Sequence, residues 1–97
     1  MDELYTKLAN LAARYGAQRL VLYGSRARGD FHARSDVDLA VYGMPEKQRG
    51  GFSLEAEDLP TLLKLDIVHI SENMEPAFLQ NIEKDGVTLY AAEDGKL

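Results

Sequence analysis

The sequence predicts a single small α/β (α+β) domain in which helices pack against a four-stranded sheet. Amphipathic or polar segments alternate with short apolar runs in the order α-β-(short α)-β-α-β-α-β. Hydrophobic residues make up 45% of the 97 and charged residues 28%, a balance typical of globular rather than disordered chains. Because a chain of this length buries one modest core, we expect one domain over residues 1–97, with a polar C-terminal tail from about residue 92.

The first helix and the first strand have the clearest boundaries. Residues 1–16 place leucines on one stripe at helical spacing, and Gly16 is a natural stop for this helix. Residues 19–23 form a short apolar run, which predicts a strand buried on both faces. This strand ends abruptly at a Gly-Ser pair, and a polar, arginine-rich stretch follows it.

The second strand and the segment after it show two different patterns. Residues 36–42 alternate polar and apolar side chains before becoming wholly apolar, which predicts a strand. Residues 43–52 carry a proline and a glycine pair, which predict an exposed loop. A short helix is expected to begin at about Leu54, with Ser53 as its N-cap.

The C-terminal part predicts two more strands and a helix between them. Residues 64–70 form an apolar strand with one carboxylate in its middle, and residues 87–91 form the fourth strand. The helix between them spans about residues 76–84. Its helically spaced positions are Ala77, Phe78, Asn81, Ile82 and Asp85. We expect the helices to back one face of the sheet.

Charge and composition exclude several classes of function. The 16 acidic and 11 basic residues give a formal net charge of −5, which argues against a surface that grips a polymeric nucleic acid. There is no cysteine, so the chain has no disulfide, thiolate zinc site or cysteine nucleophile. The N-terminal segment does not resemble a signal peptide, and no apolar run is long enough to span a membrane. We therefore expect a soluble, cytoplasmic protein with no membrane partner.

Two aspartates open the second predicted strand, and a third lies alone in the next one. Because strand side chains alternate between faces, Asp36 and Asp38 project to the same side, with Cα atoms about 6.5–7 Å apart. Leu39 then points to the opposite, core face. If the strand that carries Asp66 lies beside the second strand, all three carboxylates converge on one patch of the sheet.

Three neighbouring carboxylates indicate metal-dependent chemistry. They repel one another unless positive charge lies between them, and hard oxygen ligands suit Mg²⁺. Two such ions roughly 3.5–4 Å apart activate an attacking oxygen and stabilise the leaving oxygen in a displacement at phosphorus. The aspartates therefore predict phosphoryl or nucleotidyl transfer.

The Gly-Ser pair predicts a phosphate site next to these acids. Gly24 lets the backbone approach a triphosphate closely, and Ser25 at a helix start directs a hydroxyl and free N–H groups toward an anion. Arg26 and Arg28 add two positive charges. The five tyrosines, in contrast, are interpreted as core or half-buried aromatics rather than as a base-stacking platform.

Each of these features alone also has a structural interpretation. An Asp-x-Asp pair is common where a turn meets a strand, and a Gly-Ser pair often forms only a tight turn. An isolated acid such as Asp66 protects an edge strand from aggregation. The combination is what favours function: a Gly-Ser turn after an apolar strand, ten residues, an Asp-x-Asp pair, and an isolated aspartate in the next strand.

This combination resembles the signature of the DNA polymerase β-like nucleotidyltransferase superfamily. The runs Gly24–Gly29 and Ser35–Val41 are further similar to its small prokaryotic branch, the minimal nucleotidyltransferases of the MNT (MntA-like) type. The resemblance extends over most of the chain, including the first helix, the strand of Asp66 and the last strand. It implies a nucleotidyltransferase fold with a mixed four-stranded sheet, and an enzyme of class EC 2.7.7.

The resemblance also implies a role for each site residue. Asp36 and Asp38 would bind both of two Mg²⁺ ions. Asp66 would bind the catalytic ion and help to deprotonate the acceptor hydroxyl. The phosphates of ATP, the expected substrate, would be held by Gly24, Ser25 and Arg28.

Partners are implied by the same resemblance. Minimal nucleotidyltransferases of this type act as antitoxins that transfer AMP from ATP to a tyrosine of a HEPN-domain toxin, so such AMPylation is expected here. Larger relatives carry a further domain for the acceptor, and 97 residues leave no room for one. Two alternatives remain open: an antitoxin that blocks its toxin by binding alone, and transfer to a small molecule or to RNA. Exposed sheet edges also leave self-association open.

Overall fold

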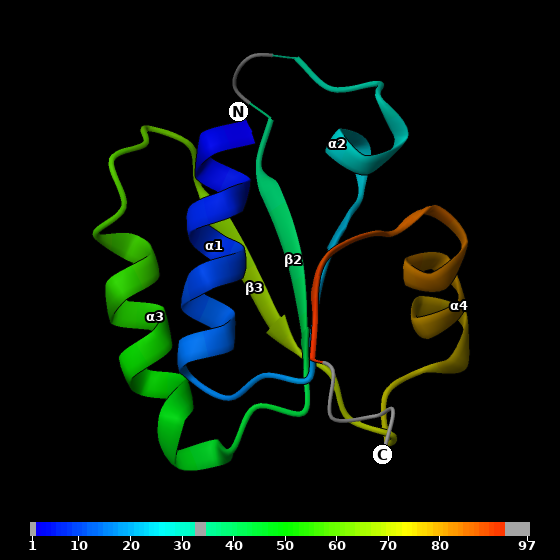
Figure 1. Ribbon diagram of the computed structural model, residues 1–97. Coiled ribbons are helices and arrows are strands. Elements are labelled where there is room, and N and C mark those ends of the chain that lie inside the picture. The colour runs from blue at the N-terminus through cyan, green and yellow to red at the C-terminus, as the bar shows by residue number, and fades with distance from the viewer. Residues whose placement is uncertain (1, 33–34, 93–97) are drawn as a thin grey trace.

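The helices and strands follow one another in the predicted order (Figure 1). The structure is a computed structural model that describes residues 2–32 and 35–92. The strand bounds agree with the predicted ones to within one residue. In chain order the elements are α1 (Asp2–Arg14), β1 (Arg19–Tyr23), α2 (Ser25–Arg28), β2 (Val37–Tyr42), the 3-10 helix η1 (Glu46–Gln48), α3 (Arg49–Glu57), β3 (Leu65–His69), α4 (Pro76–Asp85) and β4 (Val87–Ala91).

The strands form one mixed sheet in the order β3-β2-β1-β4. β1 is antiparallel to both β2 and β4, whereas β2 and β3 are parallel. Parallel neighbours need a crossover connection, which η1 and α3 provide between β2 and β3. The predicted fold class, an α/β domain with helices packed against a mixed four-stranded sheet, is confirmed.

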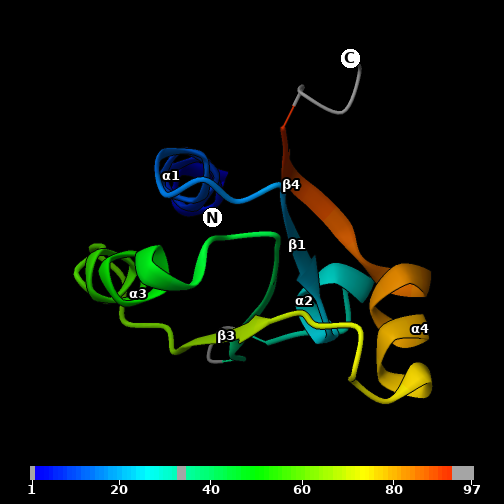
Figure 2. The same cartoon turned by 90° about the horizontal axis from the view of Figure 1, so that it is seen from below.

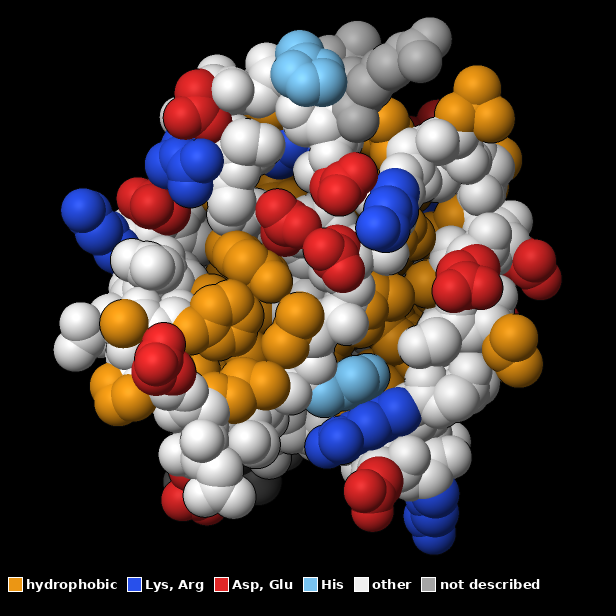
Figure 3. All heavy atoms as spheres, turned by 180° about the vertical axis from the view of Figure 1, so that it is seen from behind, with side chains coloured by type: hydrophobic (Ala, Val, Ile, Leu, Met, Phe, Trp, Pro, Cys, Tyr) orange, Lys and Arg blue, Asp and Glu red, His pale blue; other side chains and the backbone are white. Residues whose placement is uncertain are grey.

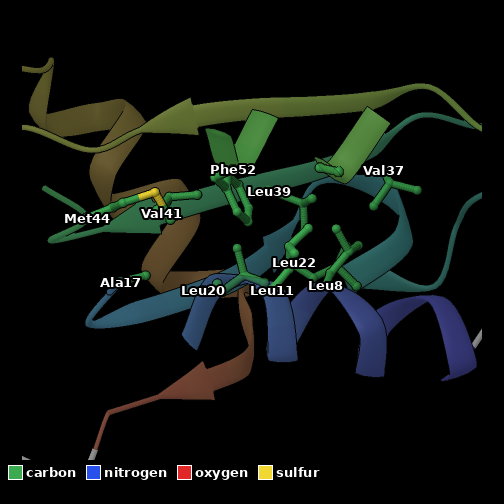
Figure 4. Packing of buried hydrophobic residues seen from close by; sticks show 12 residues of the cluster. Leu8, Leu11, Ala17, Leu20, Leu22, Val37, Leu39, Val41, Met44 and Phe52 are labelled. Atoms are coloured by element: carbon green, nitrogen blue, oxygen red, sulfur yellow. The ribbon is translucent and has the colours of Figure 1, made fainter. Parts of the chain in front are cut away.

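The larger core lies between one face of the sheet and the helices α1 and α3 (Figure 4). Every second residue of β2 points into it, so Val37, Leu39 and Val41 are almost completely buried. Leu8 of α1 and Phe52 of α3 are fully buried in the same cluster. Each such side chain contributes about 1.5–3 kcal/mol by leaving water. This burial fixes the face of β2 on which its polar residues lie.

Helix α4 covers part of the opposite face, so the expectation of helices on one face only is wrong. Figure 2 shows the sheet nearly edge-on, with α1 and α3 on one side and α2 and α4 on the other. The physical reason is in β1, which is apolar on both faces. Its Val21 packs with Ala40 and Ile82 in a second, smaller cluster that α4 closes. On this face of β2, α4 covers the part around Ala40, and the part around Asp38 is available for a site.

Helix α3 begins at Arg49, inside the segment that was expected to be a loop, and Ser53 does not cap it. Phe52 and Ala56 are four residues apart and both completely buried, which draws the segment into helical form. Gly51 is needed for packing rather than for a turn, since a β-carbon there would lie 2.8 Å from the ring of Tyr15. A glycine that signals a turn in the sequence thus allows α3 to pack closely against the residue that follows α1.

Two further expectations concern the tail and membranes. The predicted polar tail falls mainly on residues 93–97, which lie outside the described residues. No helix within residues 2–32 and 35–92 combines the length and the apolar character needed to cross a bilayer.

Candidate active site

Asp38 and Asp66 are direct neighbours across the parallel strands β2 and β3. Residues in register on adjacent strands project to the same face. Because Leu39 and Ile67, the next pair in register, face the larger core, both aspartates face away from it. The sequence predicted that these carboxylates converge only if the strand of Asp66 lies beside that of Asp38. The structure meets this condition.

Asp36 lies just before β2 and is exposed, and its charge also acts on Asp38. The pKa of the Asp38 carboxyl is raised above its usual value, first by partial burial and then by the negative charges of Asp66 and Asp36. The guanidinium of Arg28 opposes this rise. Figure 3 shows acidic side chains gathered in the upper middle of this side of the molecule, with hydrophobic side chains beside them. The patch thus carries negative potential that the chain itself compensates only in part.

Gly24 joins β1 to α2 in direct contact with Asp38. Its φ of 78° is in the left-handed region, which favours glycine. A β-carbon on residue 24 would collide with Oδ2 of Asp38 and would lie 3.3 Å from its Cγ. The carbonyl of Gly24 accepts hydrogen bonds from the backbone N–H groups of Ala27 and Arg28, both at 3.1 Å. The turn therefore brings the start of α2 against Asp38.

Ser25 is the first residue of α2, as the sequence predicted for a short helix after the Gly-Ser pair. The first N–H groups of a helix have no partner within the helix. The carbonyl of Ser25 accepts hydrogen bonds from Gly29 at 2.9 Å and from Asp30 at 3.1 Å, which close this single turn. Gly29, with φ of 89°, ends the helix in the left-handed conformation.

The two arginines of α2 have different roles. Arg26 is only 7% exposed; its Nε donates to the carbonyl of Ser35 at 3.0 Å, and its guanidinium lies 4.6 Å from the ring centre of Phe31. It therefore braces the loop that leads to Asp36, and the positive charge that the sequence predicts for it is largely buried. Arg28 is exposed and pairs with Asp30 at 3.2 Å. Of the two, Arg28 is the one whose charge is accessible at the surface.

Tyr23 is a site neighbour that the sequence did not single out. It is the antiparallel partner of Asp38 across β1 and β2, so the two side chains share a face. Partial burial raises the pKa of the Tyr23 phenol, and the charges of Asp38 and Asp66 raise it further. With Gly24 and Arg28 it lines one side of a pocket of about 330 Å³ whose other side is α4. The strand register, which no local sequence pattern specifies, is what places this tyrosine at the site.

The donor atoms suit a divalent cation, although they are not gathered into a complete site. Within the described part of the chain, no group of three or more His, Cys, Asp or Glu side chains is placed to hold a metal ion. Carboxylate oxygens are nevertheless the ligands that Mg²⁺ prefers. A cation between Asp38 and Asp66 would also relieve the repulsion that raises the pKa of Asp38. The chemistry of the residues present thus fits such an ion.

A mixed sheet that carries paired aspartates beside a Gly-Ser turn is characteristic of the nucleotidyltransferase fold. The family model described as polymerase beta, nucleotidyltransferase, matches residues 6–94, and the chain belongs to this family. A comparison with curated proteins found no match.

Several solved structures share this fold. A toxin–antitoxin complex with AMP-PNP matches with a TM-score of 0.70 and 22% identity, over 94% of this chain and 76% of that one. Tri-AMPylated Shewanella oneidensis HEPN toxin in complex with MNT antitoxin matches with a TM-score of 0.65 and 19% identity, over 99% and 77%. A protein described provisionally as a minimal nucleotidyltransferase matches with a TM-score of 0.70 and 27% identity, over 89% of both chains. The expected resemblance to minimal nucleotidyltransferases and MNT antitoxins is confirmed.

Proposed function

We propose that this protein is a Mg²⁺-dependent nucleotidyltransferase that transfers AMP from ATP to a hydroxyl of a HEPN-domain toxin, and so acts as the toxin's antitoxin. The observation that carries the proposal is the register of Asp38 with Asp66, beside the Gly24 turn. The family supplies the reaction class. The similarity to toxin–antitoxin complexes supports the choice of partner.

The three aspartates are proposed as the metal ligands and catalytic residues. Asp36 and Asp38 would hold two ions jointly, and Asp66 would hold one of them. When bound, divalent ions there neutralise phosphate charge and make the acceptor hydroxyl more acidic. The acceptor oxygen attacks the α-phosphorus of ATP, the bond from that phosphorus to the bridging oxygen breaks, and pyrophosphate leaves. Asp66, exposed at the edge of the sheet, accepts the proton of the hydroxyl and passes it to water.

Gly24, Ser25 and Arg28 are proposed to bind the triphosphate. The missing side chain at Gly24 lets phosphate oxygens approach the backbone at the start of α2. Ser25 contributes its N–H and hydroxyl, and Arg28 contributes a positive charge that already acts on Asp38. In this proposal the phosphates lie between the aspartates and α2.

The proposal is tested by incubating the protein with Mg²⁺, ATP labelled at the α-phosphate, and a HEPN-domain protein encoded beside it. Label should appear on the HEPN protein and should be lost in the Asp36→Asn, Asp38→Asn double variant. Asp58→Asn is a matched control, since Asp58 is an exposed acid at the end of α3, a helix that packs on the core face of the sheet. Transfer that survives the double substitution would remove the proposed mechanism.

A second candidate is an antitoxin that acts by binding alone. It is favoured by the observation that the described carboxylates do not form a complete metal site. The two candidates differ in cells that express the HEPN protein. If the Asp36→Asn, Asp38→Asn variant still restores growth, binding accounts for neutralisation; if growth stays arrested, transfer does.

A further inference from the structure

One stripe of α4 has no part in the mechanism above. Phe78, Asn81, Ile82 and Asp85 are spaced by three, one and three residues, so they share one face of the helix. All four line the same pocket as Tyr23, Gly24 and Arg28. The pocket therefore opens between α4 and the turn at which β1 passes into α2, directly beside the proposed phosphate site.

The walls of this pocket differ in charge from one side to the other. Its β1–α2 side carries the guanidinium of Arg28 and the open backbone at Gly24. Its α4 side carries the amide of Asn81 and the carboxylate of Asp85. Phosphates are attracted to the first side and repelled by Asp85. A ligand with an anionic end and a polar, uncharged end fits this polarity in one orientation only.

The pocket also has an aromatic and apolar surface. The rings of Tyr23 and Phe78 meet edge to face, with centroids 5.9 Å apart, and both are partly exposed. Ile82 is completely buried beneath them. Flat, half-buried rings beside an amide and a carboxylate suit a heterocycle attached to a sugar, which combines a π-face with hydroxyl and amine donors.

Asp85 occupies a position that helix stability does not favour. It is the last residue of α4, where the carbonyl groups of the helix concentrate partial negative charge. A carboxylate there costs stability instead of adding to it. Hydrogen bonds from a ligand to this carboxylate would account for an aspartate at this position, whereas helix stability does not.

We infer that this pocket binds the nucleoside part of the nucleotide, with Asp85 accepting hydrogen bonds from the ribose hydroxyls and Asn81 meeting the edge of the base. This inference rests on the proposed function, because it extends outward from the phosphate site at Gly24 and Arg28. It makes α4 the element that selects among nucleotides. The aspartates of the sheet then contribute to catalysis but not to the choice of base.

The test is calorimetric binding of two probes, each with Mg²⁺: a non-hydrolysable ATP analogue and inorganic tripolyphosphate, which has no nucleoside. Asn81→Ala and Asp85→Ala should each weaken the ATP analogue by about 5–30-fold, the loss expected for a hydrogen bond in a partly enclosed site, and leave tripolyphosphate unchanged. Arg28→Ala should weaken both probes. Gln80→Ala, an exposed change on the same helix that does not line the pocket, should alter neither.

A ligand change isolates Asp85. Removing both ribose hydroxyls from the ATP analogue should weaken its binding to the wild-type protein but cost nothing further in Asp85→Ala. Because that substitution removes an unfavourable charge from the end of α4, it should not lower Tm.

Different failures have different meanings. If Asn81→Ala and Asp85→Ala bind the ATP analogue within twofold of wild type, the nucleoside does not lie in this pocket and the inference is overturned. Equal weakening of both probes overturns it as well, because the phosphates would then occupy the α4 side. If the wild-type protein binds neither probe, the proposed function itself fails.

Discussion

The carboxylate of Asp38 occupies the space that a β-carbon on residue 24 would need. Residue 24 therefore requires glycine for two reasons. Its φ is 78°, and the carboxyl group of Asp38 is packed against it, with Cγ 3.3 Å from where a β-carbon would lie. The end of β1 and the start of β2 are interlocked at this contact. The same contact places the turn before α2 next to the aspartates.

Gly24→Ala should therefore both destabilise the fold and displace Asp38. Gly29→Ala is a partial control: Gly29 also has a positive φ, of 89°, although its ψ of 5° differs from the −155° of Gly24, and nothing lies within 4 Å of a β-carbon there. Backbone strain alone costs about 1–2 kcal/mol, which for Gly29→Ala corresponds to a fall in Tm of about 4–16 °C. The Tm of Gly24→Ala should fall further than that of Gly29→Ala, and this variant should also lose transfer activity. Equal losses of stability would show that the contact with Asp38 does not matter.

Asp38→Asn should raise Tm at neutral pH in the absence of divalent cations. The pKa of Asp38 is raised in the folded protein by burial and by its acidic neighbours, so the ionised carboxylate opposes folding. An amide of the same shape removes that repulsion. Tm should rise by about 2–4 °C, the change expected for a fraction of a kcal/mol in a domain of this length.

The pH dependence of this gain follows from the sign of the pKa shift. The stabilising contribution of a protonated Asp38 is fully present below its unfolded pKa, about 3.9, and is lost as the pH rises through the higher folded value. The difference in Tm between Asp38→Asn and wild type should therefore be small near pH 4 and grow toward pH 7. Mg²⁺ should raise Tm more in the wild type than in the variant. A Tm difference that stays constant from pH 4 to pH 7 would contradict the raised pKa of Asp38.

The arginines of α2 should separate stability from nucleotide binding. Arg26→Ala removes the hydrogen bond to Ser35 and the contact with Phe31, at a cost of about 1–3 kcal/mol, and Tm should fall by about 4–24 °C. Arg28→Ala removes an exposed ion pair worth about 0–1 kcal/mol, so Tm should hardly change. Binding of the ATP analogue should nevertheless weaken about 5–10-fold. If Arg26→Ala weakened binding without lowering Tm and Arg28→Ala lowered Tm without weakening binding, the two roles would be exchanged.

Much of the fold could be predicted because its strands are short, largely apolar runs bounded by polar turns. The placement of α3 could not, since the glycine pair before Phe52 is a turn signal locally and a packing feature in the folded chain. The second helical layer was missed for a related reason. β1 reads as buried on both faces, but only the packing of Val21 with Ile82 shows that α4 covers one of them.

The candidate site likewise has one part that the sequence predicts and another that it does not. Local spacing places Asp36 and Asp38 together, but the contribution of Tyr23 depends on an antiparallel register that involves residues far apart in sequence. Arg26 and Arg28 are equivalent in the sequence. Their separation depends on which side chain turns inward against the loop at Ser35, a matter of tertiary packing.

The most direct test of the proposed function is the intact mass of the HEPN-domain protein after incubation with this protein, ATP and Mg²⁺. The proposed function predicts a mass increase by one or more AMP units with wild-type protein, and no increase with Asp38→Asn or when Mg²⁺ is chelated. An unmodified HEPN protein in the wild-type reaction, or the same increase with Asp38→Asn, would contradict it.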